Sequence, residues 1–195
     1  MRKKSHIALG VGLVHGLDLR DRFKHKFTFY FASIWPDLTP SFLTKRHCMA
    51  ETYEDFCEKL AEFVDRYRIK RDMGFASTFR MGVLMHHIAD YFTYPHNTHF
   101  PGTLGDHVSY EEVLKKEMYH YIGCVLDATH APALPTYTDI ESIKAYLLAR
   151  HKTYLSLPGN VKTDCSYAYM TAAVILTSLL VTAEQKSLTP EVQAA

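Results

Sequence analysis

The chain has 195 residues, a length that fits one domain with a sizeable hydrophobic core. Its 47% hydrophobic and 22% charged residues are ordinary for a globular protein, and its formal net charge of +1 favours neither nucleic acid nor another acidic polymer as a partner. The 12 histidines are the unusual feature, whereas the 4 scattered cysteines lack CxxC spacing and are expected to be small core thiols.

The first half of the chain predicts three helical segments. The first begins at the candidate N-cap Ser5 and runs to about Leu19. The second, an aromatic stretch at 23–34, ends before Pro36 because the residue preceding a proline is pushed out of the α region. The third, at 50–68, is amphipathic, and its apolar residues recur every three or four positions at Tyr53, Phe56, Leu60 and Val64.

The second half of the chain predicts four more helices, at 75–92, 106–122, 139–154 and 163–185. Pro95 ends the first of these four. Alternation of apolar and polar residues, which is typical of strands, is nearly absent. The expected fold is therefore all-α, a single domain over residues 1–195 with about six or seven helices.

Two apolar stretches bear on where the protein is located. Residues 7–14 are rich in glycine and alanine and run into His15, which makes a poor signal-peptide core. Residues 168–183 are shorter than the roughly 20 residues that a membrane span needs, and Thr171, Thr177 and Ser178 interrupt them. We therefore expect a cytoplasmic protein in which 168–183 forms a central core helix.

Histidines and acids recur at helical spacing between residues 86 and 111. His86 and Asp90 are four residues apart, as are His107 and Glu111, so each pair shares one helix face and can reach one metal ion. His96 follows the end of the first of these helices. A lone core histidine is more often hydrogen-bonded than a ligand, and an acid near a helix start can simply favour the macrodipole, but two pairs together favour a metal site. The histidines that we interpret as surface or structural residues are His87, His99, His120, His130 and His151.

The segment HHIADYFTYPHN, residues 86–97, resembles the signature of the bacterial zinc-dependent phospholipase C family, which is related to the single-strand-specific zinc nucleases. In that signature an Asp follows a His by four residues and a second His follows by ten, which selects His86 over His87. GDHVSYEE (105–112) is similar to a downstream segment of the family, and KSHIALGVGL (4–13) to its first helix. SIWPDLTP (33–40), with His47 after it, matches an Asp and a His of the second helical stretch.

The resemblance implies a helical protein with up to three zinc ions in one metal-binding cleft, held by nitrogen and oxygen ligands. One ion would be held by Asp37, His47 and His86. Asp90 would bridge it to a second ion, which His6 would also bind. The third ion would be held by His96, His107 and Glu111.

This sequence departs from the family at the second of these ions. Secreted members complete a site with the amine and the tryptophan that cleavage of their leader exposes, whereas here residues 1–5 contain no tryptophan and no cleavage is expected. The ion between His6 and Asp90 is therefore expected to be weakly held, to use another donor such as His15, or to be missing. Two or three zinc ions are expected in total. The choline-binding residues of the family cannot be aligned, so choline specificity is not carried over.

The expected activity is that of a zinc-dependent hydrolase, phospholipase C-like, in which a metal-activated water attacks a phosphodiester. The candidate catalytic residues are Asp37 and Asp90: a water shared by the ions around Asp90 would attack phosphorus, and Asp37 would either orient or deprotonate that water or act only as a ligand. The expected partner is a phospholipid or another phosphodiester, and the aromatic stretch 22–35 either contacts a membrane interface or packs in the core. The alternatives are a nuclease-like or small-molecule phosphodiesterase or phosphatase, and a non-catalytic, zinc-stabilised helical binding protein.

Overall fold

The computed structural model describes residues 1–39, 47–67, 73–128 and 133–188. Within these ranges the chain contains helices and no strand, which confirms the predicted all-α class. Two short 3-10 helices, η1 (Pro36–Leu38) and η3 (Tyr94–His96), carry candidate site residues. The α-helices are α1 (Lys3–Gly16), α2 (Lys26–Ala32), α3 (Met49–Arg66), α4 (Phe75–Tyr91), α5 (Leu104–Asp127), α6 (Ile140–Leu155) and α7 (Val161–Ser187).

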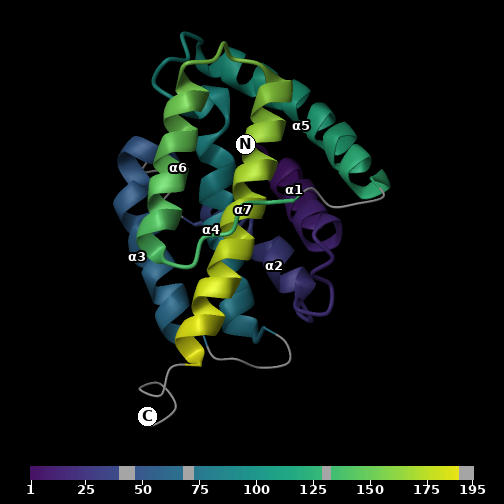
Figure 1. Cartoon of the computed structure of the whole chain (residues 1–195). Coiled ribbons are helices and arrows are strands. Elements are labelled where there is room, and N and C mark those ends of the chain that lie inside the picture. The colour runs from purple at the N-terminus through teal and green to yellow at the C-terminus, as the bar shows by residue number, and fades with distance from the viewer. Residues whose placement is uncertain (40–46, 68–72, 129–132, 189–195) are drawn as a thin grey trace.

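The long helix α7 forms the centre of the fold. It runs beside α6 and α4, and α5 packs against its N-terminal half (Figure 1). Among the described helices it is the one whose length and composition could cross a membrane, but 72% of its apolar window is buried inside the fold. The segment 168–183 therefore lies in the core, where its fully buried side chains include Ala168, Ala172, Ile175, Leu176 and Leu179.

Two glycines allow helices to approach one another closely. A Cβ atom at Gly82 of α4 would lie 2.6 Å from the Phe29 carbonyl oxygen of α2. A Cβ atom at Gly12 of α1 would lie 2.5 Å from Ile122 Cδ1 of α5. At Gly82 the clash is with backbone, so glycine sets the spacing of α2 and α4, whereas at Gly12 the end of the Ile122 side chain would have to shift. Gly82 lies one turn before His86 and thereby brings α2 next to that histidine.

The first two helices differ from the sequence-based expectation at their ends. The N-cap expected at Ser5 is wrong, because α1 begins at Lys3 and Ser5 is fully buried within it. Helix α1 ends at Gly16, before Asp18, which has a left-handed φ of 51° that does not continue a helix. Helix α2 covers only Lys26–Ala32 of the expected 23–34.

Helix α5 begins earlier than expected because its first turn is capped. The Thr103 backbone N–H donates to Asp106 Oδ2 at 2.7 Å, and the Asp106 backbone N–H donates to Thr103 Oγ1 at 3.3 Å. These reciprocal bonds form a capping box and satisfy two backbone donors that a helix start leaves unpaired. The cap moves the start of the helix to Leu104 and fixes the turn that carries His107.

Asp164 ties the first turn of α7 to three other elements. Its side chain is fully buried, and Oδ1 accepts a hydrogen bond from the Tyr154 hydroxyl of α6 at 2.7 Å. Oδ2 accepts from the Tyr110 hydroxyl of α5 and from the backbone N–H of Tyr94, each at 2.9 Å. Because Tyr94 begins η3, Asp164 fixes the segment that carries His96. Burial raises the pKa of Asp164 to about 6 despite these bonds.

The raised pKa of Asp164 makes one contribution to stability fall as the pH rises. The ordinary pKa of this carboxyl is 3.8, so between that value and about 6 the folded chain binds the proton more tightly than the unfolded chain does. We expect the free energy of unfolding of the wild type, relative to that of Asp164→Asn, to be about 2 kcal/mol larger at about pH 4.5 than at about pH 7.5 in urea titrations. A difference that stays the same at both pH values would contradict this assignment.

Candidate metal centre

The last two turns of α4 place two ionisable side chains in the core. His86 and Asp90 are both 0% exposed, and His86 Nε2 lies 3.1 Å from Asp90 Oδ2 across one helical turn. Their neighbours Leu84 and Ile88 are buried as well. Because burying a charge costs several kcal/mol unless a partner compensates it, this pair needs further polar or cationic contacts.

Two more side chains meet this pair, Asp37 from η1 and His47 from the segment just before α3. His47 Nδ1 lies 3.4 Å from Asp37 Oδ1 and 3.3 Å from Asp90 Oδ2. It also lies 3.1 Å from His86 Nε2. Ligand atoms of all four residues lie within 4.8 Å of one another, a spacing that fits a single ion between them.

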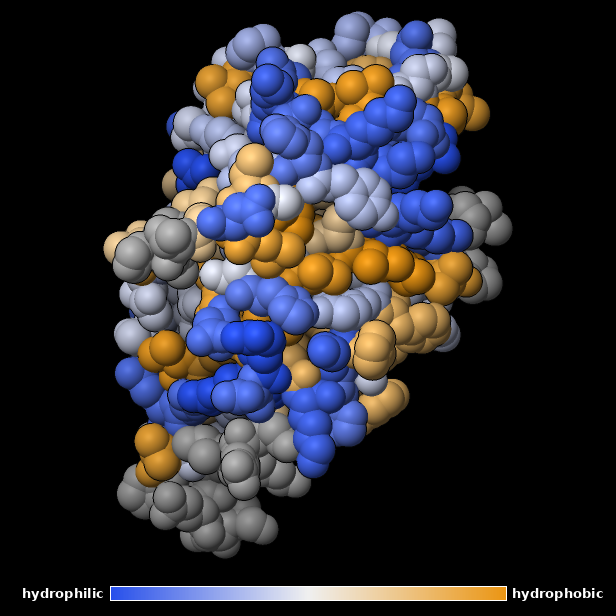
Figure 2. Space-filling model, turned by 90° about the vertical axis from the view of Figure 1, so that its right-hand side faces the viewer, coloured by the Kyte–Doolittle hydropathy of each residue, from blue (hydrophilic) through white to orange (hydrophobic). Residues whose placement is uncertain are grey.

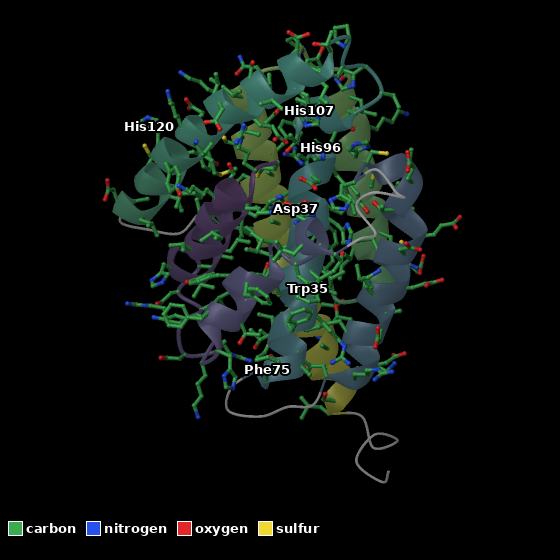
Figure 3. All side chains as sticks on the ribbon, turned by 180° about the vertical axis from the view of Figure 1, so that it is seen from behind. Trp35, Asp37, Phe75, His96, His107 and His120 are labelled. Carbon is green, nitrogen blue, oxygen red and sulfur yellow. The ribbon has the colours of Figure 1, made fainter. Side chains whose placement is uncertain are left out.

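A second group combines His96 of η3 with His107 and Glu111 of α5. Glu111 Oε1 lies 3.1 Å from both His96 Nε2 and His107 Nε2. The two imidazole rings have centroids 5.1 Å apart, and Figure 3 shows both histidines close together and near Asp37. The ligand atoms of this group also lie within 4.8 Å of one another. Two candidate metal groups therefore lie in one region of the fold.

Asp90 joins the two groups because its two oxygens face different partners. Oδ2 faces His86 and His47. Oδ1 lies 3.3 Å from His6 Nε2 and 3.6 Å from His96 Nδ1. A carboxylate with neighbours on both oxygens has the geometry of a bridge between two ions, and this geometry supports the bridging role that we expect for Asp90.

The α-amino group of Met1 lies where three of the site residues meet. Its nitrogen is 2.7 Å from Asp90 Oδ1, 2.8 Å from His96 Nε2 and 3.0 Å from Glu111 Oε1. Burial opposes its protonation, but the two carboxylates outweigh burial and raise its pKa, so a positive charge occupies this point. His15, the alternative donor, lies about 13 Å from His6 along α1 and does not reach the site.

Several buried polar atoms here fit a metal ion better than they fit one another. Both ring nitrogens of His6 and Oδ2 of Asp90 are buried and make no hydrogen bond of good geometry among the described residues, although His86 Nε2 and His47 Nδ1 lie 3.1 Å and 3.3 Å from that oxygen. A buried polar atom left unsatisfied costs about 1–3 kcal/mol. An ion between these side chains would satisfy them, and imidazole with carboxylate is a donor set that suits zinc.

The pKa values in the site favour ionised carboxylates, a neutral His6 and a protonated His47, whose proton a bound metal ion would displace. Burial raises the pKa of Asp90, but the nearby ring of His96 and the Met1 amino group, with the other imidazoles around the carboxylate, outweigh burial and hold that pKa well below its usual value. The nearby carboxylates of Asp37 and Asp90 raise the pKa of His47 to about 9. Burial lowers the pKa of His6 to about 4, which keeps its imidazole in the neutral form that binds metals.

Backbone carbonyls orient two of the imidazole rings. His86 Nδ1 donates a hydrogen bond to the Ser33 carbonyl at 2.9 Å, which directs Nε2 towards Asp90. His96 Nδ1 donates to the His47 carbonyl at 3.4 Å. These contacts join residues 53 and 49 positions apart, so no local spacing in the sequence could indicate them.

The remaining histidines lie outside both groups. His87 is buried, with 7% exposure, and burial holds its pKa well below the usual value, so it is a neutral core residue and not a surface one. His151 Nε2 lies 3.0 Å from Asn97 Oδ1 in a structural contact. His99 and His120 are exposed, and His130 is outside the described residues.

The two groups open into a cleft with a volume of about 1030 Å³. His6, His86 and Asp90 lie behind its wall and are 0–1% exposed. Five candidate ligands form part of the wall itself: Asp37, His47, His96, His107 and Glu111. The candidate metal groups are therefore accessible from one side and enclosed by the core on the other.

Comparison with known proteins identifies one family. The family model described as zinc dependent phospholipase C matches residues 5–177, a range that includes every candidate ligand from His6 to Glu111. No curated protein and no solved structure matches the chain.

The geometry predicts that substitution of Asp90 removes more bound zinc than substitution of His107. Asp90→Asn removes a charge that faces both groups, whereas His107→Ala removes one ligand of the second group. We expect Asp90→Asn to lower the zinc-to-protein ratio more than His107→Ala does, as measured by mass spectrometry of metal in dialysed protein.

The matched control is His15→Ala, which removes a histidine of α1 that lies outside both groups. It should keep the wild-type zinc content, and circular dichroism should show equal helix content in all variants. The two-group assignment fails if Asp90→Asn binds as much zinc as the wild type does, or if His15→Ala loses as much as Asp90→Asn.

Proposed function

Because the chain belongs to the zinc-dependent phospholipase C family, we propose that it is a zinc-dependent hydrolase of phospholipid phosphodiesters. The observation that carries the proposal is the convergence of imidazoles and carboxylates from separate helices at the floor of an open cleft. A site that only held the fold together would have no need to present its ligands to a cleft of this size.

Exposure of the candidate ligands favours a hydrolytic site over a purely structural one. A structural zinc is enclosed by four protein ligands, whereas a catalytic zinc keeps a position for water or substrate. The side chains of Asp37 and His107 are 21% and 29% exposed and belong to the cleft wall. This accessibility supports hydrolysis more than it supports a non-catalytic, zinc-stabilised binding module.

Bound zinc would neutralise phosphate oxygens and lower the pKa of water towards neutrality. Asp37 and Glu111 are the two carboxylates in the cleft wall, and Asp37 (21% exposed) is more accessible than Glu111 (14%), so Asp37 is better placed to orient such a water or to accept its proton. Burial raises the pKa of Asp37, but its hydrogen bond with His47 together with the nearby rings of His86 and His6 outweighs burial and lowers that pKa, so the carboxylate is ionised. Asp90 is fully buried and cannot meet a substrate, so its role is to hold the two groups together.

The substitution Asp37→Asn tests whether Asp37 acts as a base or only as a metal ligand. The substitution keeps the shape of the side chain and removes its charge, so we expect kcat for bis-p-nitrophenyl phosphate to fall about 100-fold or more while most of the zinc stays bound. Asp127→Asn, an exposed position at the end of α5, is the control and should keep wild-type turnover. Wild-type turnover in Asp37→Asn would refute the role of Asp37 as base.

The aromatic stretch near the site is divided between core and surface. Phe23 and Phe29 are 1% and 0% exposed, so for them the core interpretation is correct. Phe27, Phe31 and Trp35 are 77%, 46% and 40% exposed and are available to an interface. Figure 2 shows hydrophobic residues gathered in a band across the side of the molecule that carries α1, α2 and α5.

The exposed aromatic residues form a strip that starts next to the site. The ring centroids of Phe31 and Trp35 are 5.5 Å apart, and Trp35 precedes Asp37 by two residues. Figure 3 shows Trp35 near Asp37 and, further from the site, Phe75, which is 62% exposed. Aromatic side chains with basic neighbours are typical of surfaces that rest on a lipid headgroup boundary. We therefore propose that this strip contacts the lipid surface that holds the substrate.

The strip predicts a selective effect on lipid binding. Phe27→Ser combined with Phe31→Ser removes two exposed rings, so we expect co-sedimentation with phospholipid vesicles to weaken about tenfold or more. Turnover of soluble bis-p-nitrophenyl phosphate should stay at the wild-type level.

The matched control pairs Leu148→Ser with Leu155→Ser, two exposed apolar residues of α6 (46% and 39%). This pair should leave vesicle binding unchanged. Equal vesicle binding by the wild type and the phenylalanine variant would refute the proposed contact of the strip with lipid. The assignment of the metal groups would be unaffected.

A further inference from the structure

Beyond the candidate ligands, the wall of the cleft is cationic. Arg2, Lys3 and Lys4 at the start of α1 and Lys115 of α5 all line it. Among the lining residues the acidic side chains are those of Asp37 and Glu111, which belong to the two candidate metal groups. The part of the wall that does not hold metal therefore contributes only positive charge.

These cations are incompletely neutralised by their neighbours. Glu112 lies 2.7 Å from Arg2 and 2.5 Å from Lys115, so one carboxylate is shared between two cations. Lys3 and Lys4 are exposed and form no ion pair within the described part of the chain. The cleft consequently has a net positive rim that can attract an anion in addition to the one bound at the metal groups.

The opposite end of the cleft is apolar. Leu104, Val108, Glu111 and Lys115 recur every three or four residues and so share one face of α5. Leu104 and Val108 are 79% and 46% exposed and precede Glu111, whereas Lys115 follows it by one turn. The cleft therefore runs from an apolar end, past the candidate metal groups, to a cationic end.

We propose that this cleft prefers phosphodiesters whose headgroup carries a second negative charge and disfavours those with an ammonium headgroup. The proposal rests on the proposed function, because it takes the metal groups as the place where the reacting phosphate binds. Lys3, Lys4 and Lys115 would face the second anion, and the apolar end would face the remainder of the lipid. Such electrostatic contacts act mainly on selectivity between substrates.

Three phosphomonoesters with the same phosphate and different headgroups test this preference without turnover. They are phosphocholine, glycerol 3-phosphate and inositol 1,4-bisphosphate, each titrated into zinc-loaded protein in a calorimeter. We expect inositol 1,4-bisphosphate to bind about tenfold more tightly than glycerol 3-phosphate, phosphocholine to bind most weakly, and the differences to shrink with added salt.

The double variant Lys3→Gln with Lys4→Gln should reduce the spread of the three affinities to about threefold or less. Lys116→Gln is the matched control, because Lys116 is exposed beside Lys115 but does not line the cleft. It should leave the spread unchanged. Lys115→Gln repeats the comparison from another helix and keeps the test decisive if the double variant fails to fold.

Equal affinities for the three ligands, or tightest binding of phosphocholine, would overturn the preference. A uniform loss of affinity for all three ligands in the double variant would also refute the headgroup preference. Turnover of short-chain phospholipids with the same headgroups separates this inference from the proposed function. If the binding order is found but no diester is cleaved, the hydrolase assignment fails and the headgroup preference stands.

Discussion

The burial of Asp90 is the constraint on which the rest of the structure depends. Its carboxylate is 0% exposed, and its two oxygens face imidazoles and an amine from different parts of the chain. Because an uncompensated buried charge costs several kcal/mol, a fold that contains this group must bring cations to it. Ligands from several helices converge on Asp90 and compensate its buried charge. The same convergence forms the candidate metal site.

The packing of the helices holds the site together, because no single segment contains it. Gly82 lets α2 approach α4, which brings the Ser33 carbonyl to the ring of His86. Asp164 of α7 holds the backbone at Tyr94 and with it the segment of His96. Since the contacts that hold the helices also position the ligands, an ion that binds only the folded chain also stabilises it.

Local spacing in the sequence was sufficient to predict the all-α class and the two His-xxx-acid pairs, because residues four apart on a helix are neighbours in any fold. It did not predict the contact of the Met1 amine with Asp90 or the role of Asp164, since both depend on residues far apart in the chain. The N-cap expected at Ser5 was wrong for the related reason that tertiary packing buries that residue inside α1.

An enclosed side and an open side give the site its chemical character, because the core fixes the ligands while the cleft admits water and substrate. A crystal structure of the zinc-loaded protein with anomalous diffraction at the zinc edge would show directly whether both groups bind zinc. We expect zinc peaks about 2 Å from the imidazole nitrogens and carboxylate oxygens of both groups, with Asp90 bound to more than one ion. An absence of zinc at both groups, with the rings of His86 and His107 turned away from the carboxylates, would contradict this expectation.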